Sequence, residues 1–321
     1  MDGEMSLLRF ESTMIKLFFT ILLATLFPAK GHFVVFLNFL TAITISLLFF
    51  MHGSRLSRKK LILGSSNWQL HLCILLSTFL LFPILGLLLG WWHPLNIPAE
   101  IYTGFIYLCI LPATVQSAIA FTSMAGGNVA AAICSASASS FLGIFLSPFL
   151  LNLVINIEYG SSNKIEQITK IMLHLLLPFI LGHLLRRWTS GWIEKHDYII
   201  NEMDKYSILL VVYSAISEAI GNSIWNKLGF QAMLSIITGC MLLLSIVLLI
   251  NLLVARLLRL DKQDEIVVLF CGSKKSLANG LPMAHLLFPG SIRGMILLPL
   301  MIFHQIQLLV CSIIVQIYKN R

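Results

Sequence analysis

The feature that most constrains this chain is the stretch from Ile101 to Ile157, which contains no Asp, Glu, Lys or Arg. A soluble domain covers its core with charged residues, which make up about 25% of a globular protein. In this chain charged residues account for 11% and hydrophobic residues for 58%. A soluble core does not hide so much uncharged sequence. We therefore expect an all-α polytopic membrane protein.

The charge and the cysteines exclude several other classes of protein. The formal net charge of +8 does not indicate a nucleic-acid-binding protein, because the basic residues are scattered through short segments between apolar runs. The six cysteines lie singly inside apolar runs, with no CxxC pair to suggest disulfides or a zinc site. The sequence contains no HExxH motif and no nucleophile elbow. We expect no enzyme, no cofactor and no metal other than a sodium ion.

Apolar segments of membrane-spanning length predict ten transmembrane helices. These spans are about 14–29, 33–51, 67–90, 101–124, 128–151, 167–187, 205–222, 231–256, 265–288 and 292–316. If both termini are cytoplasmic, fifteen basic residues lie inside and five outside, which is the asymmetry that the positive-inside rule describes. We expect an integral protein of the cell (inner) membrane with both termini in the cytoplasm.

The ninth span carries two adjacent lysines near its middle. If its helix begins at Asp264, Lys275 lies eleven residues further on, about 16 Å along the helix and near the midplane of a ~30 Å hydrocarbon core. An ammonium group at that depth is costly unless it is paired or hydrated, so we interpret Lys274 and Lys275 as site residues. Snorkelling to an interface is the alternative if the helix bounds differ. Polar neighbours complete this group of candidates: Ser273, Ser276 and Asn279.

The fourth span is interrupted at a matching depth, because Pro112 lies eleven residues after Ile101. A helix broken there exposes carbonyls that favour a cation before the break and N–H groups that favour an anion after it. The candidate ligands at this break are Thr114, Gln116 and Ser117. A simple proline kink, whose polar neighbours bond back to the chain, is the alternative.

The interrupted spans suggest an internal repeat. The chain divides into two sets of five spans, residues 14–151 and 167–316, and the interrupted span is the fourth of each set. An odd number of spans per set gives the two sets opposite orientations, so we predict two inverted five-helix repeats. This prediction rests on the pattern of spans, without residue identity between the halves. Matched interruptions in two halves are a sequence sign of a transporter site.

Two further groups are candidates for binding or coupling. Ser135 and Ser139 of the fifth span are four residues apart and share a helix face. Their small side chains let helices pack closely, and their hydroxyls could also ligate an ion or a substrate. Glu218 is the one carboxylate well inside a predicted span. It is a candidate for coupling, by pairing with an intramembrane lysine or by carrying a proton.

Two segments carry a family resemblance: LPATVQSAIAFTSMAGGNVAAAICSASASS (111–140) and FCGSKKSLANGLPM (270–283). They resemble the bile acid:sodium symporter family, most closely its symporter-like branch of orphan members, and the resemblance covers nearly the whole chain. It implies a core domain of helices about 67–151 and 231–316, in which broken helices four and nine cross. It also implies a panel domain of helices about 14–51 and 167–222, and sodium-driven uptake of organic anions by alternating access.

The family's sodium ligands lie in spans four, five and nine, and the resemblance places them on this chain only in part. The span-four polar pair falls near Ser117 and Ala118, and the span-five hydroxyls fall near Ser135 and Ser139. Span nine departs from the family pattern. Its carboxylate position falls near Cys271 and its glutamine position near Lys275. A fixed ammonium at a cation site repels sodium and could replace it electrostatically.

These features predict a secondary active transporter of a small organic anion, with or without sodium coupling, whose site lies where the fourth and ninth spans cross. One alternative is a proton-coupled or uncoupled carrier that uses Lys275, which burial keeps near neutral so that it can take up a proton. The other is a membrane protein without solute flux that acts as a regulatory or assembly partner. The expected partners are the organic anion and the lipid bilayer, and the oligomeric state is not predicted.

Overall fold

A computed structural model describes residues 15, 16, 18–55, 67–91, 97–154, 173, 176–221 and 229–319, and all regular structure in these ranges is helical. Five helices there are long and apolar enough to cross a membrane: His32–Arg55, Trp68–Gly90, Val129–Val154, Gln231–Leu257 and Gly290–Lys319. The chain is an integral membrane protein. The first and sixth predicted spans lie partly outside the described residues, so the number of ten helices stays a prediction.

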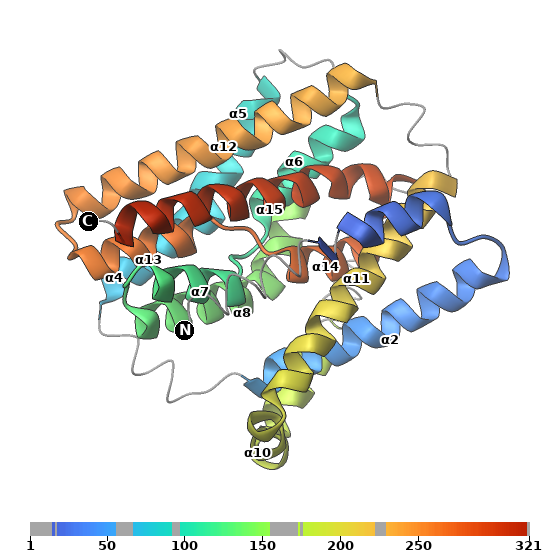
Figure 1. The fold of residues 1–321 in the computed structure, drawn as a ribbon, viewed down its shortest axis with the longest axis horizontal. Coiled ribbons are helices and arrows are strands. Elements are labelled where there is room, and N and C mark those ends of the chain that lie inside the picture. Colours follow the sequence, from blue (N-terminus) through green and yellow to red (C-terminus); the bar gives the residue numbers. More distant parts are fainter. Residues whose placement is uncertain are drawn as a thin grey trace. The chain divides into compact units, whose positions relative to one another are not determined.

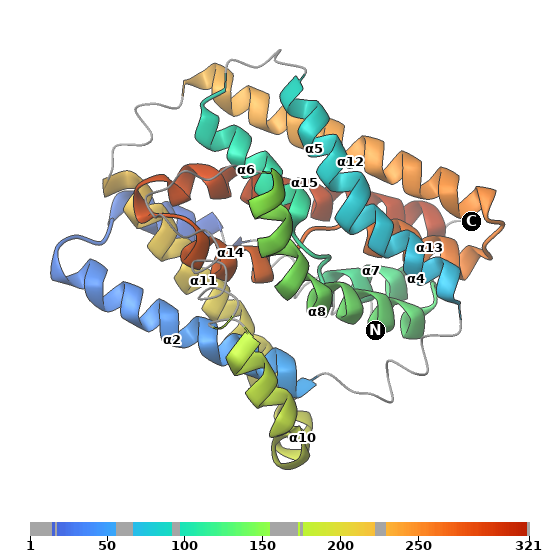
Figure 2. The same ribbon diagram turned by 180° about the vertical axis from the view of Figure 1, so that it is seen from behind.

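The chain divides into two compact units. The first unit contains residues 1–56, 157–228 and 281–295, and the second contains residues 57–156, 229–280 and 296–321. Figures 1 and 2 show the helices from opposite sides, coloured along the sequence. The ranges predicted as panel helices lie in the first unit. The ranges predicted as core helices lie in the second unit, except for residues 281–295.

The first unit is built on helices that approach each other through glycine. Its helices are helical residues 18–26, α2 (His32–Arg55), helical residues 176–184, α10 (Arg186–Lys195) and α11 (Asp197–Gly221), together with part of α14 (Leu277–Leu287) and the start of α15 (Gly290–Lys319). A Cβ on Gly53 of α2 would overlap the carbonyl oxygen of Phe179, and a Cβ on Gly182 would overlap that of Phe50. Small residues at a helix interface allow this close packing of backbones.

The second unit contains most of the helices. They are α4 (Trp68–Leu76), the π-helix η1 (Ser77–Leu81), α5 (Phe82–Trp91), α6 (Ala99–Ile110), α7 (Gln116–Met124), α8 (Val129–Val154), α12 (Phe230–Leu257) and α13 (Lys262–Gly272). The boundary between the units at residues 280 and 281 falls within α14 (Leu277–Leu287), and the one at residues 295 and 296 falls within α15 (Gly290–Lys319).

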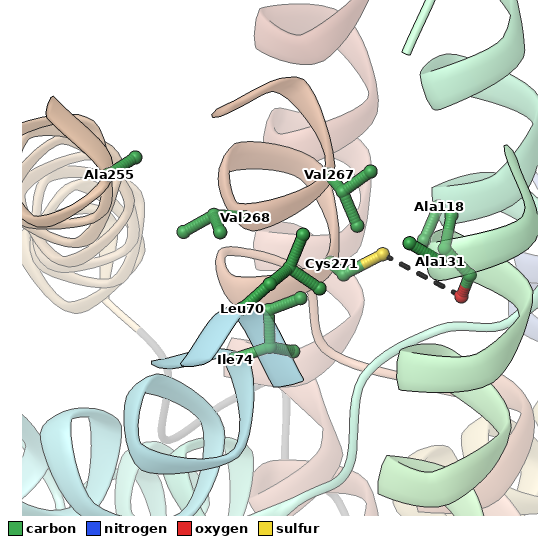
Figure 3. Packing of buried hydrophobic residues seen from close by; sticks show 9 residues of the cluster. Leu70, Ile74, Ala118, Ala131, Ala255, Val267, Val268 and Cys271 are labelled. Atoms are coloured by element: carbon green, nitrogen blue, oxygen red, sulfur yellow. Dashed lines mark hydrogen bonds between the residues drawn. The ribbon is translucent and has the colours of Figure 1, made fainter. Parts of the chain in front are cut away.

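Helix α13 is the buried centre of the second unit. It packs against α4, α7, α8 and α12, and Figure 3 shows the apolar side chains that fill this contact. Val267, Val268 and Cys271 of α13 are fully buried and contact residues of the surrounding helices. Those partners are Leu70, Ile74, Ala118, Ala131, Ala132 and Ala255. Burial on all sides explains why this span is apolar around its whole circumference rather than along one stripe.

One carboxylate joins the starts of three helices. Asp264 accepts hydrogen bonds from the side-chain amides of Asn67 at 2.9 Å and Asn128 at 3.0 Å. Asn67 also caps α4, and Asn128 accepts the N–H of Ala131 in the first turn of α8. Helix N-termini carry partial positive charge. The buried Asp264 side chain, where the three N-termini meet, therefore fixes the starts of α4, α8 and α13 relative to one another.

Helix α8 comes close to Pro112 through Gly143. A Cβ on Gly143 would lie 2.5 Å from Pro112 Cβ, and a proline ring cannot rotate away. We predict that Gly143→Ala lowers the free energy of unfolding by about 1–3 kcal/mol, because it overpacks this contact. Thermal unfolding in detergent measures the change. Gly191→Ala is the matched control, because a Cβ on Gly191 meets nothing within 4 Å. The control should stabilise by about 0.5–1 kcal/mol, and equal shifts in the two variants would contradict the prediction.

Candidate functional site

Two non-helical segments meet in the second unit. Residues 111–115 separate α6 from α7, and residues 273–276 separate α13 from α14. The N–H of Ser276 donates to the carbonyl of Pro112 at 2.9 Å, so the segments are in direct contact. Peptide groups that lack helical partners inside a membrane protein must find other partners. Those partners define the candidate site.

Helix α6 ends where its hydrogen-bond ladder loses a donor. Pro112 has no N–H to donate to the carbonyl of Leu108. The next N–H, of Ala113, donates to Ser139 Oγ at 3.0 Å instead of continuing the helix. Ser147 Oγ, also on α8, donates to the carbonyl of Ile110 at 2.8 Å. The serines of the fifth predicted span therefore close part of the broken end of α6.

The remaining carbonyls at this end accept from a lysine. Lys275 Nζ donates to the carbonyls of Cys109 at 2.8 Å and Leu111 at 2.7 Å. Carbonyls at a helix C-terminus carry the negative end of the helix dipole, so they favour a cation. The ammonium group lies at the position where the sequence predicts a cation-binding end of α6.

A third acceptor comes from the π-helix η1. In η1 the N–H of Phe82 donates to the carbonyl of Ser77. The residue five positions after Thr78 is Pro83, which has no N–H. The Thr78 carbonyl is therefore open, and it accepts from Lys275 Nζ at 2.8 Å. Pi-helical turns of this kind are frequent at functional sites.

All three N–H groups of the Lys275 ammonium thus donate to backbone carbonyls. The side chain is 0% exposed, and the ring centroid of Phe82 lies 4.1 Å from Nζ, a cation–π distance. Three carbonyl oxygens and an aromatic face form a cradle for a single positive charge. Chemically, this arrangement can hold one monovalent cation, and Lys275 supplies it.

Gln307 of α15 fixes the backbone at Lys275. Its side-chain oxygen accepts the Lys275 N–H at 3.0 Å, and its amide nitrogen donates to the Lys275 carbonyl at 3.1 Å. The same nitrogen lies 2.9 Å from His304 Nδ1. A side-chain amide that pairs with both peptide groups replaces the hydrogen bonds that a helix would make here. Gln307 therefore holds the non-helical segment in place.

Lys274 has a different environment from Lys275. Its ammonium donates to the carbonyl of Ser117 at 3.2 Å and lies 3.6 Å from the ring centroid of Phe121. The side chain is also 0% exposed. An ammonium group has three donors, and among the described residues this one makes a single hydrogen bond. Lys274 therefore has donors to spare for a further acceptor, whereas Lys275 has none.

The other candidate ligands make hydrogen bonds within the second unit. Thr114 and Ser117 pair their hydroxyls at 2.7 Å, the Ser276 hydroxyl accepts the N–H of Asn279 at 3.1 Å, and Asn279 donates to Ser140 at 2.8 Å. Ser135 pairs with His71 of α4 at 2.7 Å, and Ser273 donates back to the carbonyl of Leu269 in the preceding helix α13. The structure thus gathers Thr114, Ser117, Ser139 and Ser276 with the two lysines. Ser135, Ser273 and the side-chain amide of Asn279 bond to other groups, and Gln116 is exposed at the start of α7.

Glu218 lies in the first unit, where it pairs with Arg293. The distance from Arg293 Nη1 to Glu218 Oε2 is 2.6 Å, and Asn38 lies 3.5 Å from Glu218 Oε1. Arg293 also donates to the carbonyls of His285 and Phe288 before α15 begins. Arg293 is one of the five basic residues that the predicted topology places outside, but it is only 7% exposed. The pair links α11 to the corner between α14 and α15.

The sequence offers no site role for Thr78 or Ser147, and it indicates Gln307 only as a residue that could line the site. Thr78 contributes only a backbone carbonyl, and the one local signal is Pro83 five residues later. Ser147 precedes Pro148 inside an apolar helix, so its hydroxyl is readily interpreted as packing. Gln307 is a polar side chain within an apolar span, which marks it as a candidate for function, but nothing in the sequence shows that it binds the peptide groups of Lys275.

Comparison with known proteins identifies relatives across the whole chain. A profile of the SBF-like CPA transporter family matches residues 11–320. "Putative symporter YfeH" of Escherichia coli (strain K12) is 58% identical over 301 residues, which is 94% of this chain and 90% of the relative. "Uncharacterized protein PA2026" of Pseudomonas aeruginosa is 48% identical over 94% of this chain and 91% of its own. "Sodium/bile acid cotransporter 7" of Xenopus tropicalis is 27% identical over 88% of this chain and 82% of its own.

Proposed function

Because this chain belongs to the SBF-like CPA transporter family, we propose that it is a secondary active transporter of a small organic anion. It moves the solute by alternating access across the cell (inner) membrane, with both termini in the cytoplasm. Ten transmembrane helices form two inverted five-helix repeats, and α6–α7 and α13–α14 are their broken fourth helices. The solute site lies where residues 111–115 and 273–276 meet.

The observation that carries this proposal is the buried Lys275 ammonium among three backbone carbonyls. A charge so deep in an apolar protein is costly, and such residues mark ion and substrate pathways in membrane proteins. The charge is covalently fixed, so no ion from solution has to fill this position. Lys275 therefore acts as the resident cation of the site, and Lys274 supplies the donors that contact the anion.

The coupling ion follows from the same electrostatics. The name of the Xenopus relative refers to sodium and to bile acid. From this name we apply only the anionic solute to the present chain. Two buried ammonium groups on adjacent residues repel a sodium ion nearby, because like charges in a low-dielectric interior interact strongly. We propose that uptake does not need sodium and that a proton gradient drives it. An uncoupled carrier, in which the solute moves down its own gradient, is the alternative. Glu218 is the candidate proton carrier.

Uptake into proteoliposomes tests this function. A panel of organic anions is first screened for thermal stabilisation of the purified protein, and the stabilising compounds are then assayed as radiolabelled solutes. We expect uptake of at least one anion, with equal rates when sodium outside is replaced by choline. Lys274→Gln removes a charge-assisted hydrogen bond worth about 1.5–3 kcal/mol, so it should weaken the apparent affinity for the anion by roughly 10–150-fold.

Lys262→Gln is the matched control, because Lys262 is exposed at the start of α13. It should leave uptake unchanged. Uptake that stops without sodium would contradict the proposed coupling, and a panel in which no anion is taken up would contradict the proposed substrate class. An affinity unchanged in Lys274→Gln would remove Lys274 from the anion site.

A further inference from the structure

Helix α10 is too short to cross the bilayer. Its 10 residues extend about 15 Å, half of the ~30 Å hydrocarbon core. Its inner side packs against the end of α2, where Ile193 clusters with Met51, Ile200 and Phe50. Helix α2 is long enough to span the membrane. Figures 1 and 2 both show α10 at one end of α2 and α11. The end of a membrane-spanning helix lies near a membrane surface, so α10 lies at that level.

The outer side of α10 combines aromatic and basic residues. Trp188 and Trp192 are four residues apart and are 75% and 58% exposed. Arg187 and Lys195 are exposed as well. At about 100° per residue, all four side chains lie at least about 100° around the helix from the buried Ile193. They therefore share the side of α10 that the rest of the first unit leaves uncovered.

The chemistry of this side matches a lipid headgroup. Indole rings favour the membrane interface, where one edge is apolar and the other can donate a hydrogen bond. Guanidinium and ammonium groups bind phosphate oxygens through charge-assisted hydrogen bonds. Within α10 the sequence has three basic residues, Arg186, Arg187 and Lys195, and one acidic residue, Glu194, a balance of +2. A short basic helix with tryptophans at the bilayer surface is typical of an interfacial helix that prefers anionic lipid.

We propose that α10 is an interfacial helix that binds the headgroups of anionic phospholipids through Arg187 and Lys195, with Trp188 and Trp192 inserted beside them. The binding anchors the first unit to the anionic leaflet. By the distribution of basic residues in the sequence, this leaflet is the cytoplasmic one. The inference does not depend on which solute the protein carries or on what drives its transport.

Tryptophan quenching in nanodiscs tests the lipid site. The full-length protein is placed in phosphatidylcholine discs that contain 20 mol% phosphatidylglycerol, with bromine on the acyl chains of one lipid or the other. At equal mole fraction of the brominated lipid, we expect stronger quenching by brominated phosphatidylglycerol. The Trp188→Phe/Trp192→Phe variant should lose this difference, which assigns it to α10 rather than to the other tryptophans.

Arg187→Gln/Lys195→Gln tests the charges. An anionic surface contributes about fivefold in affinity for each basic residue, so the double variant should lose at least fivefold of the selectivity for phosphatidylglycerol. Lys262→Gln/Lys319→Gln removes two exposed charges elsewhere and should retain it. Equal quenching by both lipids in the unmodified protein would overturn the proposal. So would full selectivity in Arg187→Gln/Lys195→Gln, or equal loss in the control. Circular dichroism and gel filtration verify that each variant is folded.

Discussion

Replacing Lys275 with alanine is expected to stop transport and to lower the free energy of unfolding by about 3–5 kcal/mol, the usual effect of removing one partner from a buried charged interaction. The substitution leaves the carbonyls of Thr78, Cys109 and Leu111 without their donor. Relief of the buried charge offsets part of this loss. It does not offset all of it, because three carbonyls at about 1–3 kcal/mol each remain to be satisfied.

Lys275→Met separates the charge from the side-chain stem. Methionine keeps an unbranched apolar chain that fills most of the space, so a loss caused by packing alone would largely recover in Lys275→Met. We expect both variants to be destabilised and inactive, as measured by denaturation in detergent and by uptake into proteoliposomes. Solute flux that is unchanged in Lys275→Ala would remove this lysine from the mechanism.

Breaking the Glu218–Arg293 pair has the second large expected effect. Arg293→Gln leaves a half-buried carboxylate without its arginine beside the start of α15 and frees the carbonyls of His285 and Phe288. We predict a loss of about 3–5 kcal/mol in the free energy of unfolding. The double variant Glu218→Gln/Arg293→Gln also removes the carboxylate charge and should recover part of the loss, as a double-mutant cycle measures.

The same variants test the proposed coupling role of Glu218. If Glu218 is a structural partner of Arg293, Glu218→Gln should lower stability and leave the pH dependence of uptake unchanged. If it carries the coupling proton, the driving effect of a proton gradient disappears in Glu218→Gln while uptake down the solute gradient persists. Additive effects of the two single substitutions would contradict the pairing itself.

Some of the fold follows from sequence alone. The absence of charge from Ile101 to Ile157 predicts a helical membrane protein, and the described helices confirm this. The resemblance to bile acid:sodium symporters, based on the segments around Ser117 and Lys275, is confirmed by the family match over residues 11–320. These features are local in the sequence, since an apolar run or a motif keeps its meaning whatever packs beside it.

The contacts that satisfy the site are not local, and sequence reasoning did not find them. Nothing near Lys275 in the sequence shows that its ammonium reaches the carbonyl of Thr78, 197 residues away. That contact depends on a π-helix, which no side-chain pattern marks clearly. The Glu218–Arg293 pair joins residues 75 apart, so the sequence presents an intramembrane carboxylate and a loop arginine as separate features. The lipid-facing side of α10 is not evident from the sequence either, because its basic residues fit a topology signal equally well.

The most direct test of the cation cradle is the salt dependence of thermal unfolding in Lys275→Ala. Removal of the ammonium leaves three carbonyl oxygens facing an empty position, where a small cation from solution can bind. A cation that binds only the folded state stabilises it by about 2.7 kcal/mol at one hundred times its dissociation constant. Unfolding is compared in chloride salts of sodium, potassium, methylammonium and choline at equal ionic strength. Our account predicts that methylammonium or an alkali cation, but not choline, raises the melting temperature of Lys275→Ala, while the unmodified protein responds equally to all four salts. A melting temperature of Lys275→Ala that is the same in all four salts would contradict a cation site at the end of α6.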